Sequence, residues 1–272
     1  MGRLFVIGSL NIDSVISVER HPAPGETVLG GDAAKAWGGK GANQAVAAAR
    51  TSAGSTEVIF VGRVGDDTHG HAYRERLSGM DIDVSALQAT QGTPTGEAVI
   101  VVSLDGENTI VVSSGANARL AVDDLPDESQ LSPADVLLLT LEVPAPVVVR
   151  AAELATASGA RFVLNVSPFL DVPDRAILQA DPIVVNEHEN EQLERRYGVL
   201  PSVLVTRGAA GSKWKDHVVP AIASISVVDT TGAGDAYCGA LAVRLAAGDD
   251  EYAAMQVATA AAADVVGRAG AQ

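Results

Sequence analysis

The sequence has little cysteine, few aromatic residues and a deficit of positive charge. A single cysteine in 272 residues excludes a disulfide framework. With only 4% aromatic residues, the core must be built mainly from alanine, valine and leucine. Acidic residues outnumber Lys and Arg by 34 to 19, which gives a formal net charge of −15. This balance argues against nucleic acid and anionic membrane surfaces as partners, because both attract basic proteins.

Several common functional motifs are also missing. The chain has no Walker sequence and no Gly-x-Gly-x-x-Gly after its first apolar run, which disfavours P-loop NTPases and typical dinucleotide enzymes. Its five histidines show no paired spacing of the kind that binds zinc. No apolar run is long enough for a membrane span, and no secretory leader precedes the first apolar run, Leu4–Gly8. We therefore expect a cytoplasmic protein.

Short β-branched apolar runs alternate with alanine-rich or amphipathic stretches along most of the chain. The runs predict strands at Leu4–Gly8, Glu57–Val61, Val136–Thr140, Phe162–Asn165, Ile183–Val185, Val203–Thr206 and Ile222–Val228. The other stretches predict helices at Gly41–Arg50, Thr68–Gly79, Pro146–Ser158 and Glu187–Tyr197. This alternation predicts an α/β fold with a three-layer, doubly wound, mostly parallel sheet, in one domain spanning residues 1–272. Ligands of such sheets bind beyond the carboxyl ends of the strands.

Two segments depart from this alternation and predict a second, smaller sheet. Alternating residues indicate strands at Ser14–Glu19, Thr27–Lys35, Ala98–Leu104 and Asn108–Ser113, which are joined by turns and not by helices. We expect these strands to form a small β-sheet lid, made by about residues 14–37 and 96–114, over the carboxyl ends of the main sheet.

The sequence Asp-Thr-Thr-Gly-Ala-Gly-Asp at residues 229–235 joins an apolar run to an alanine-rich helix. Its two glycines, Gly232 and Gly234, allow the backbone to approach a ligand closely. The N–H groups at the start of a helix favour an anion there. Asp235 beside such a site would suit a general base in phosphoryl transfer to a hydroxyl. Taken alone, the motif is more often a simple helix start with an acidic first turn, because short glycine motifs recur by chance.

A second glycine-rich segment, residues 38–44, also begins a helix and places Lys40 and Asn43 where they could meet a polyhydroxylated ligand. Its alternative interpretation is a hinge between lid and helix. Asn11 and Asp13 follow the first strand and, two residues apart on extended backbone, point the same way. They suit neighbouring sugar hydroxyls, although turn chemistry explains them as well. Glu142, after the strand at residues 136–140, is a candidate sugar contact or a turn carboxylate.

Two further strand ends carry candidates for the nucleotide side of a site. Asn186 and Glu189 follow a predicted strand and could orient waters around Mg²⁺, which takes few protein ligands; they also fit an N-cap with first-turn acids. Thr206 and Gly208 end the next predicted strand and would suit contact with nucleotide phosphates or ribose. They equally fit a tight turn into a hairpin at Ser212–Val219.

Taken together and in this order, the motifs resemble those of the ribokinase family of sugar kinases, over residues 4–272. The most specific matches are Gly-Gly-Lys-Gly-Ala-Asn-Gln at residues 38–44 and the segment 229–235. Shorter matches are at residues 24–27, 65–67 and 115–117. Within the family, the first motif is more similar to the kinases that act on ribose than to fructokinases or adenosine kinases.

The resemblance implies a role for each matched residue. Asp235 would be the general base, and an anion hole would be formed by the N–H groups of Gly232, Ala233 and Gly234. The residues implied to hold the sugar hydroxyls are Asn11, Asp13, Gly39, Lys40, Asn43 and Glu142. Those implied to act on the ATP side are Asn186, Glu189, Thr206 and Gly208, with Glu189 near Mg²⁺ through water. Asp229 and Thr231 would help bind a monovalent cation, typically K⁺.

The implied activity is ATP- and Mg²⁺-dependent phosphorylation of the primary hydroxyl, O5, of D-ribose to ribose 5-phosphate. The alternatives are a related kinase acting on deoxyribose, a ketohexose or a nucleoside, or a catalytically impaired sugar-binding homologue. The resemblance also implies a homodimer formed through the lid. The sequence departs from the family pattern in two places. It ends at Gln272, where the family usually continues with a serine-containing loop of the cation site and a helix. In addition, residues 197–201 leave little room for a helical segment common in the family.

Overall fold

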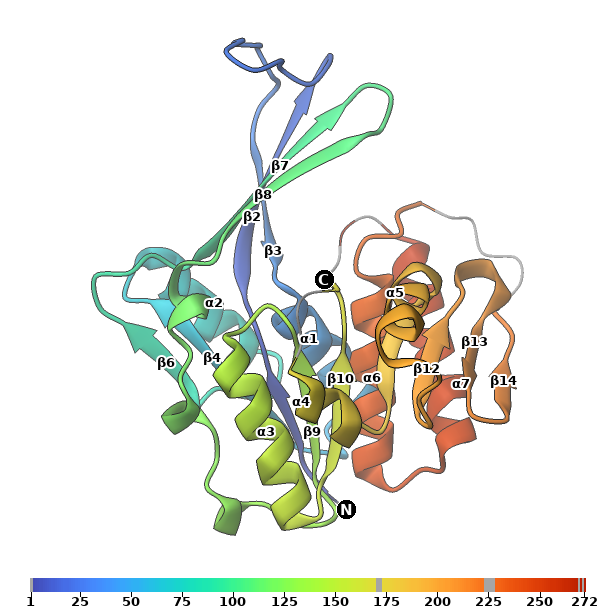
Figure 1. The fold of residues 1–272 in the computed structure, drawn as a ribbon. Helices are drawn as coiled ribbons and strands as arrows, with labels where there is room; N and C mark the ends of the chain where they lie inside the picture. Colours follow the sequence, from blue (N-terminus) through green and yellow to red (C-terminus); the bar gives the residue numbers. More distant parts are fainter. Residues whose placement is uncertain (1, 170–172, 223–227, 269, 271) are drawn as a thin grey trace.

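The computed structural model describes residues 2–169, 173–222, 228–268, 270 and 272. Its main element is a ten-stranded sheet that is parallel except at β13 and β14 (Figure 1). In spatial order its strands are β14 (His217–Val219), β13 (Ser212–Trp214), β12 (Val203–Thr206), β11 (Ile183–Asn186), β10 (Arg161–Asn165), β9 (Val136–Thr140), β1 (Leu4–Ile7), β4 (Val58–Gly65) and β5 (Ile82–Asp83), with β6 (Leu87–Thr90) also on β4.

Helices cover both faces of this sheet, which explains why strands such as β1 and β9 are buried along their whole length. One face packs against α1 (Lys40–Ser52), α2 (Thr68–Ser78), α6 (Ala233–Ala247) and α7 (Glu251–Val266). The other face packs against α3 (Ala145–Ser158), α4 (Asp174–Gln179) and α5 (Glu187–Tyr197). Side chains alternate between the two cores: Leu4 and Val6 enter the first, and Phe5 and Ile7 the second. The predicted three-layer α/β fold is thus confirmed.

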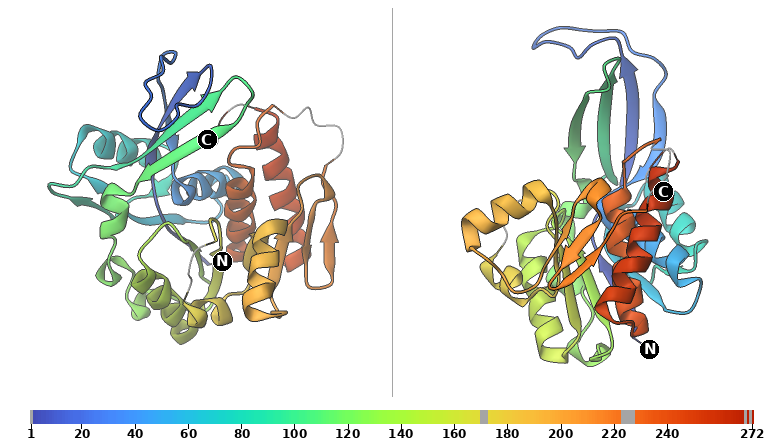
Figure 2. Two further views of the ribbon diagram at one scale, coloured as in Figure 1. Left: turned by 45° about the horizontal axis from the view of Figure 1, so that its top comes forward. Right: turned by 90° about the vertical axis from the view of Figure 1, so that its right-hand side faces the viewer.

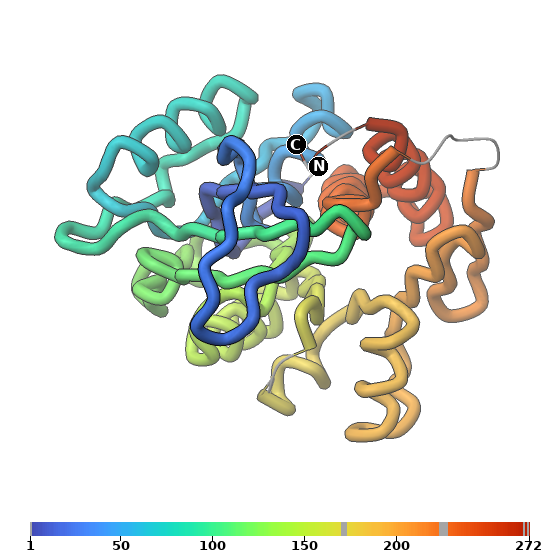
Figure 3. Tube along the Cα trace, turned by 90° about the horizontal axis from the view of Figure 1, so that it is seen from above, coloured from blue at the N-terminus to red at the C-terminus, as the bar shows by residue number. Residues whose placement is uncertain are grey.

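A second sheet of four strands rises above the carboxyl ends of the main sheet (Figures 1 and 2). Its order is β3 (Ala34–Gly38), β2 (Asn11–Val18), β7 (Gly96–Ser103) and β8 (Asn108–Ser113). Viewed from above, it crosses over the N-terminal half of the molecule (Figure 3). We call this sheet the lid.

The lid departs from the prediction in one strand. The predicted strand Thr27–Lys35 is wrong in its bounds, because β3 covers Ala34–Gly38 and pairs with β2 from Asn11 to Val15. Before β3, the segment contributes only an isolated bridge between Gly30 and Val18. The pair Gly30-Gly31 explains the difference, since glycine has no side chain to pack on a pleated surface.

Four strands and α-helices of the structure are not predicted by the sequence, and one predicted strand lies outside the described residues. Sequence reasoning did not predict the short strands β5 and β6, the short helix α4 or the long helix α7. The first three have too few residues to show a period. The strand predicted at Ile222–Val228 falls on residues 223–227, which are outside the described residues.

Candidate active site

Two adjoining cavities lie at the carboxyl ends of β10, β11 and β12. We call the smaller one, of about 210 Å³, the inner cavity; it is lined by Lys40, Asn165, Ser167, Val184, Val185, Asn186, Thr206, Gly232, Gly234, Asp235 and Cys238. The larger one, of about 660 Å³, is the outer cavity; it is lined by Thr206, Gly208, Ala209, Gly211, Ala221, Ile222, Thr230, Ala233, Gly234, Tyr237, Thr259, Ala262, Ala263 and Val266. Because Thr206 and Gly234 line both, the two cavities are neighbours.

Asp235 lies in the first turn of α6, where the inner cavity meets the helix N-terminus. The helix starts after Gly232, whose φ of 79° is in the left-handed region that favours glycine. The Asp235 side chain does not cap its own helix: Asn43 Nδ2 donates to Oδ2 at 3.0 Å, and Gln44 Nε2 donates to Oδ1 at 3.0 Å. A side chain on Gly234 would meet nothing within 4 Å, so there is open space in front of this turn.

The surroundings of Asp235 act on its pKa in both directions. The side chain is only 7% exposed, and this burial raises the pKa above its ordinary value. The charge of Lys40 and the amides of Asn43 and Gln44 oppose the rise, while the charge of Glu142 adds to it. A carboxylate that is buried, yet supplied with donors, is suited to take a proton from a bound hydroxyl.

Glu142 and Asp13 complete a group of three carboxyl groups near the start of α1. The Oε2 atom of Glu142 accepts hydrogen bonds from the Ser9 hydroxyl and from the backbone N–H of Lys40, the latter at 3.3 Å. Burial and the charge of Glu142 raise the pKa of Asp13 to about 6. Asp13 also lies against Gly38, where any Cβ would come within 2.1 Å of its Oδ2. The structure therefore brings Asp13, Lys40 and Glu142 together from three separate segments.

Asn11, Gly39 and Asn43 are held in place by backbone and amide contacts. Asn11 is buried, and its Oδ1 accepts from Asn117 Nδ2 at 2.8 Å, while Asn117 also bonds both backbone groups of Leu10. Gly39 is the N-cap residue of α1 and packs directly on Leu10 and Asn11. These contacts tie the beginning of β2 to the beginning of α1, so the lid and the helix meet at the site.

Asn186 and Glu189, which the resemblance assigned to the ATP side, form a reciprocal capping box at the start of α5. Asn186 N donates to Glu189 Oε2 at 2.9 Å, and Glu189 N donates to Asn186 Oδ1 at 2.8 Å. The structure therefore shows the N-cap interpretation of these two residues. Asn186 also lines the inner cavity. Thr206 donates to Val185 O at 3.2 Å and borders both cavities, and Gly208 borders the outer one.

The first half of the motif, Asp229–Thr231, has its own hydrogen bonds, apart from those of Asp235. Asp229 Oδ1 accepts from Thr231 N at 2.8 Å, and Oδ2 accepts from Gly270 N at 3.0 Å. Hydrogen bonding by the Thr231 side chain, together with these two N–H groups, lowers the pKa of Asp229, so the carboxylate is ionised near neutral pH. Among the described residues, no group of three or more His, Cys, Asp or Glu side chains could hold a metal ion by itself. The metal roles implied by the resemblance stay predictions.

Sequence reasoning missed several polar residues at or behind the site. Gln44 and Asn117 belong to the matched motifs at residues 38–44 and 115–117, but the resemblance implies no role for either; in the structure Gln44 bonds Asp235, and Asn117 bonds Leu10. Asn165 and Ser167 line the inner cavity. Gln272 Nε2 donates to Asn43 Oδ1 at 2.8 Å, which fixes the Asn43 amide with its nitrogen toward Asp235. Such partners are separated by as many as 229 residues, so only the motif position of Gln44 and Asn117 could have indicated them.

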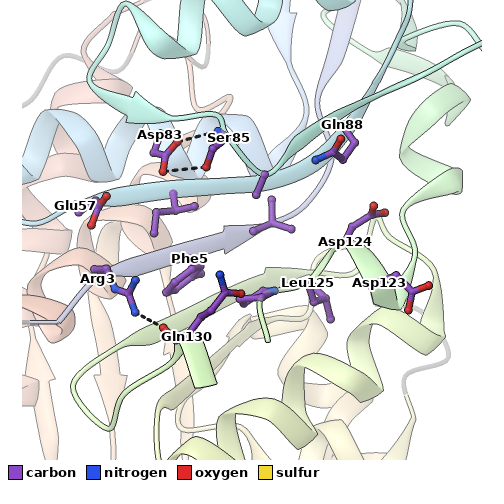
Figure 4. Close-up of a pocket in the computed structure, with 14 residues that line it drawn as sticks. Arg3, Phe5, Glu57, Asp83, Ser85, Gln88, Asp123, Asp124, Leu125 and Gln130 are labelled. Carbon is purple, nitrogen blue, oxygen red and sulfur yellow. Dashed lines mark hydrogen bonds between the residues drawn. The ribbon is translucent and has the colours of Figure 1, made fainter. Parts of the chain in front are cut away.

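A further cavity, of about 520 Å³, lies beside β1 and β4 on the α3 face and contains none of the predicted site residues (Figure 4). Phe5, Leu125 and Arg3 are among its lining residues, and Arg3 donates hydrogen bonds to Gln130 O and to the carboxylate of Asp135.

No helix in the described part of the chain is both long and apolar enough to cross a bilayer.

The doubly wound sheet, the lid and the buried acid at a glycine-framed helix start define the class of lid-bearing α/β kinases. Comparison with known families agrees over the whole length. The chain belongs to the pfkB family of carbohydrate kinases, whose family model matches residues 1–272. The resemblance inferred from the motifs is therefore confirmed.

Individual relatives cover nearly the same length. The chain is 35% identical to the ribokinase of Bacillus subtilis (strain 168) over 287 residues, covering 100% of this chain and 95% of that protein. It is 34% identical to the ribokinase of Staphylococcus aureus (strain COL) over 273 residues, covering 92% and 88%. The solved ribokinase of Thermotoga maritima superposes with a TM-score of 0.88 at 31% identity, covering 100% and 95%. Arabidopsis thaliana ribokinase, solved with ribose and ATP, gives 0.87 at 29% identity, covering 99% and 94%.

The raised pKa of Asp13 predicts a stability effect that does not depend on any substrate. Because the folded-state pKa is about 6 and the ordinary value is 3.8, ionisation of Asp13 costs the folded state free energy at every pH above this window. We expect Asp13→Asn to raise the free energy of unfolding at pH 7, and the gain to shrink as the pH falls from 6 toward 4. Urea unfolding at several pH values measures this. The control is Asp216→Asn in an exposed turn; an Asp13→Asn gain that is equal at pH 4 and pH 7 would contradict the prediction.

Proposed function

We propose that this chain is an ATP-dependent kinase that phosphorylates the primary hydroxyl, O5, of D-ribose to give ribose 5-phosphate. The observation that carries the proposal is the buried Asp235 carboxylate, held by two amides of α1 at the edge of the inner cavity. Family membership supports carbohydrate phosphorylation, and the relatives named ribokinase support ribose as the acceptor. A cytoplasmic location is part of the proposal, since ATP is the donor.

In the proposed reaction, Asp235 removes the proton from the sugar hydroxyl as the hydroxyl oxygen attacks the γ-phosphorus of ATP. The new O–P bond forms while the bond from the γ-phosphorus to the β–γ bridging oxygen breaks, and ADP leaves with the electron pair. The proton ends on Asp235. The N–H groups at the start of α6, at Gly232, Ala233 and Gly234, would stabilise the charge on the transferring group. The support is that the helix begins there and that a Cβ on Gly234 would meet nothing within 4 Å; the Ala233 N–H, which donates to Thr230 O at 3.3 Å, would exchange that bond for the phosphoryl oxygen.

The sugar would lie between the lid and the start of α1, with its reacting hydroxyl toward Asp235. Its hydroxyls would be held by Asn11, Asp13, Gly39, Lys40, Asn43 and Glu142. The support is that charges and amides from β2, α1 and the segment after β9 converge there. ATP would occupy the outer cavity, with Thr206 and Gly208 beside its phosphates or ribose, because Thr206 also borders the inner cavity.

Two cations belong to the proposal. Mg²⁺ neutralises phosphate charge when bound; Asn186 and Glu189 would hold its waters, and the mostly polar ends of β11 and α5 fit an ion that keeps most of its water. K⁺ would bind beside Asp229 and Thr231. The Asp229 carboxylate fits this role because it is ionised and each of its oxygens, which already accepts one N–H, has a further lone pair.

The role of Asp235 predicts a large and selective loss of rate. We expect Asp235→Asn to lower kcat by about 10²- to 10⁴-fold, because removal of a general base typically costs this much. Sugar KM should change far less, since the amide keeps the size of the side chain. A coupled assay of ADP release measures both constants. Asp216→Asn, in an exposed turn, should leave kcat unchanged; near-normal kcat in a folded Asp235→Asn protein would refute the assignment of the base.

The acceptor and the cations are tested together by a panel. We expect D-ribose to give the highest kcat/KM among ribose, deoxyribose, fructose and a nucleoside, with activity lost without Mg²⁺ and reduced when K⁺ is replaced by a bulky organic cation. A better acceptor than ribose would replace that part of the proposal. Calorimetric ribose binding without ADP release under all conditions would instead indicate an impaired, sugar-binding homologue.

We also propose that two copies of this chain pair through the lid. The support is the edge strand β8, in which Ile110, Val111 and Val112 are 55%, 65% and 52% exposed. An edge strand with apolar side chains and unpaired backbone groups is an unfavourable surface to leave in water.

Light scattering tests the pairing. The wild-type protein should have the mass of a dimer, and Val111→Asp should shift it to the monomer, because a carboxylate would be buried without a partner. Val218→Asp is the matched control: this valine is 50% exposed on β14, the edge strand of the main sheet, and should leave the dimer intact. A monomeric wild-type protein at micromolar concentration would rule out lid pairing.

A further inference from the structure

Gln44 is a buried polar residue without a structural explanation of its own. It is 0% exposed, and its Oε1 atom has no hydrogen-bond partner among the described residues. Its Nε2 atom makes one bond, to Asp235 Oδ1 at 3.0 Å. A buried amide with an unsatisfied carbonyl is costly, and a leucine or methionine would fill the same space without that cost. The presence of glutamine at position 44 is therefore best explained by the hydrogen bond that it donates to Asp235.

The packing of the two helices directs the Gln44 side chain onto the carboxylate. Gly239 lies one turn after Asp235 on α6, so the two residues share a face of that helix. A Cβ on Gly239 would come within 2.1 Å of the backbone oxygen of Gln44. The backbones of α1 and α6 thus lie very close together at Gln44, one helical turn from Asp235, and the Gln44 side chain reaches the carboxylate from there.

The orientation of both amides is determined by their partners. Asn43 Oδ1 accepts from Gln272, so Asn43 Nδ2 faces Asp235. For Gln44, a reversed amide would place its carbonyl oxygen against the carboxylate oxygen, which is repulsive. Consequently each oxygen of Asp235 receives one donor from consecutive residues of α1, and the carboxylate plane is fixed by two bonds.

We propose that Gln44 is a positioning residue for the catalytic base: with Asn43, it fixes the carboxylate of Asp235 and favours its ionised form. This inference rests on the proposed role of Asp235. In the described part of the chain, the other charged or titratable groups that face Asp235 are Lys40 on α1, Glu142 after β9 and the buried thiol of Cys238 on α6. Lys40 favours the carboxylate and Glu142 opposes it, so the donor from Gln44 acts in the same direction as Lys40.

The test replaces Gln44 by Met, which keeps its length but has no donor, and by Asn, which keeps the amide but is too short to reach Asp235. In both variants the acidic limb of the kcat–pH profile should move to higher pH by about one unit or more, since a donor to a charged group is lost. Below the limb, kcat should fall about tenfold or more. Ribose KM should stay within about twofold, because Gln44 is fully buried and lines neither cavity.

The matched control is Val46→Ala, which disturbs the core on the same helix without touching the carboxylate. It should lower stability but leave the acidic limb in place. NMR titration of the Asp235 carboxyl carbon, with and without Gln44, gives a readout that needs no turnover. An unchanged titration and an unchanged limb in both variants would overturn the role of Gln44. A shifted titration in a protein that phosphorylates no acceptor would support the role of Gln44 while refuting the proposed function.

Discussion

The site depends on the close packing of α1 against α6. Gly239 allows the two backbones to approach, and Gly41 does the same where α1 meets Gly8 at the end of β1. A side chain at Gly239 or Gly41 would force the helix away from its neighbour, since a Cβ at either position would lie within 3 Å of backbone atoms. With the helix in this position, its first residues deliver a cation and two amide donors to a carboxylate on α6.

This constraint also explains how an acidic protein can handle an anionic substrate. The net charge of −15 gives no general attraction for ATP, so the favourable potential must be local. Lys40 and the N-terminus of α6 supply it on the two sides of the inner cavity. The cost falls on two carboxyl groups: burial and the negative charge of Glu142 make ionisation of Asp13 and Asp235 less favourable. Such groups are common where function and not stability determines the residue.

The lid and the main sheet are coupled at the same place. Asn117 bonds Leu10 and Asn11 where β1 ends and β2 begins, and Gly39 packs against the same two residues. The sequence predicted a small second sheet as a lid, and the pfkB family match and the solved ribokinase confirm this architecture. The bounds of β3 were predicted wrongly, because this strand is defined by its register against β2 and not by its own alternation. Short elements such as β5, β6 and α4 were missed because so few residues carry no period.

The fold class, the kinase family and the polar residues at the strand ends could all be predicted from the sequence, because buried strands and glycine-framed turns leave local patterns. It also singled out Asp235: the motif alone had two interpretations, and the resemblance to the ribokinase family implied a general base, which stays a prediction. Which side chains contact one another could be seen only in the folded chain: Gln44 and Asn43 lie more than 190 residues from Asp235, and Gln272 lies 229 residues from Asn43. No local pattern encodes such distances, since they follow from the packing of whole helices on a shared sheet.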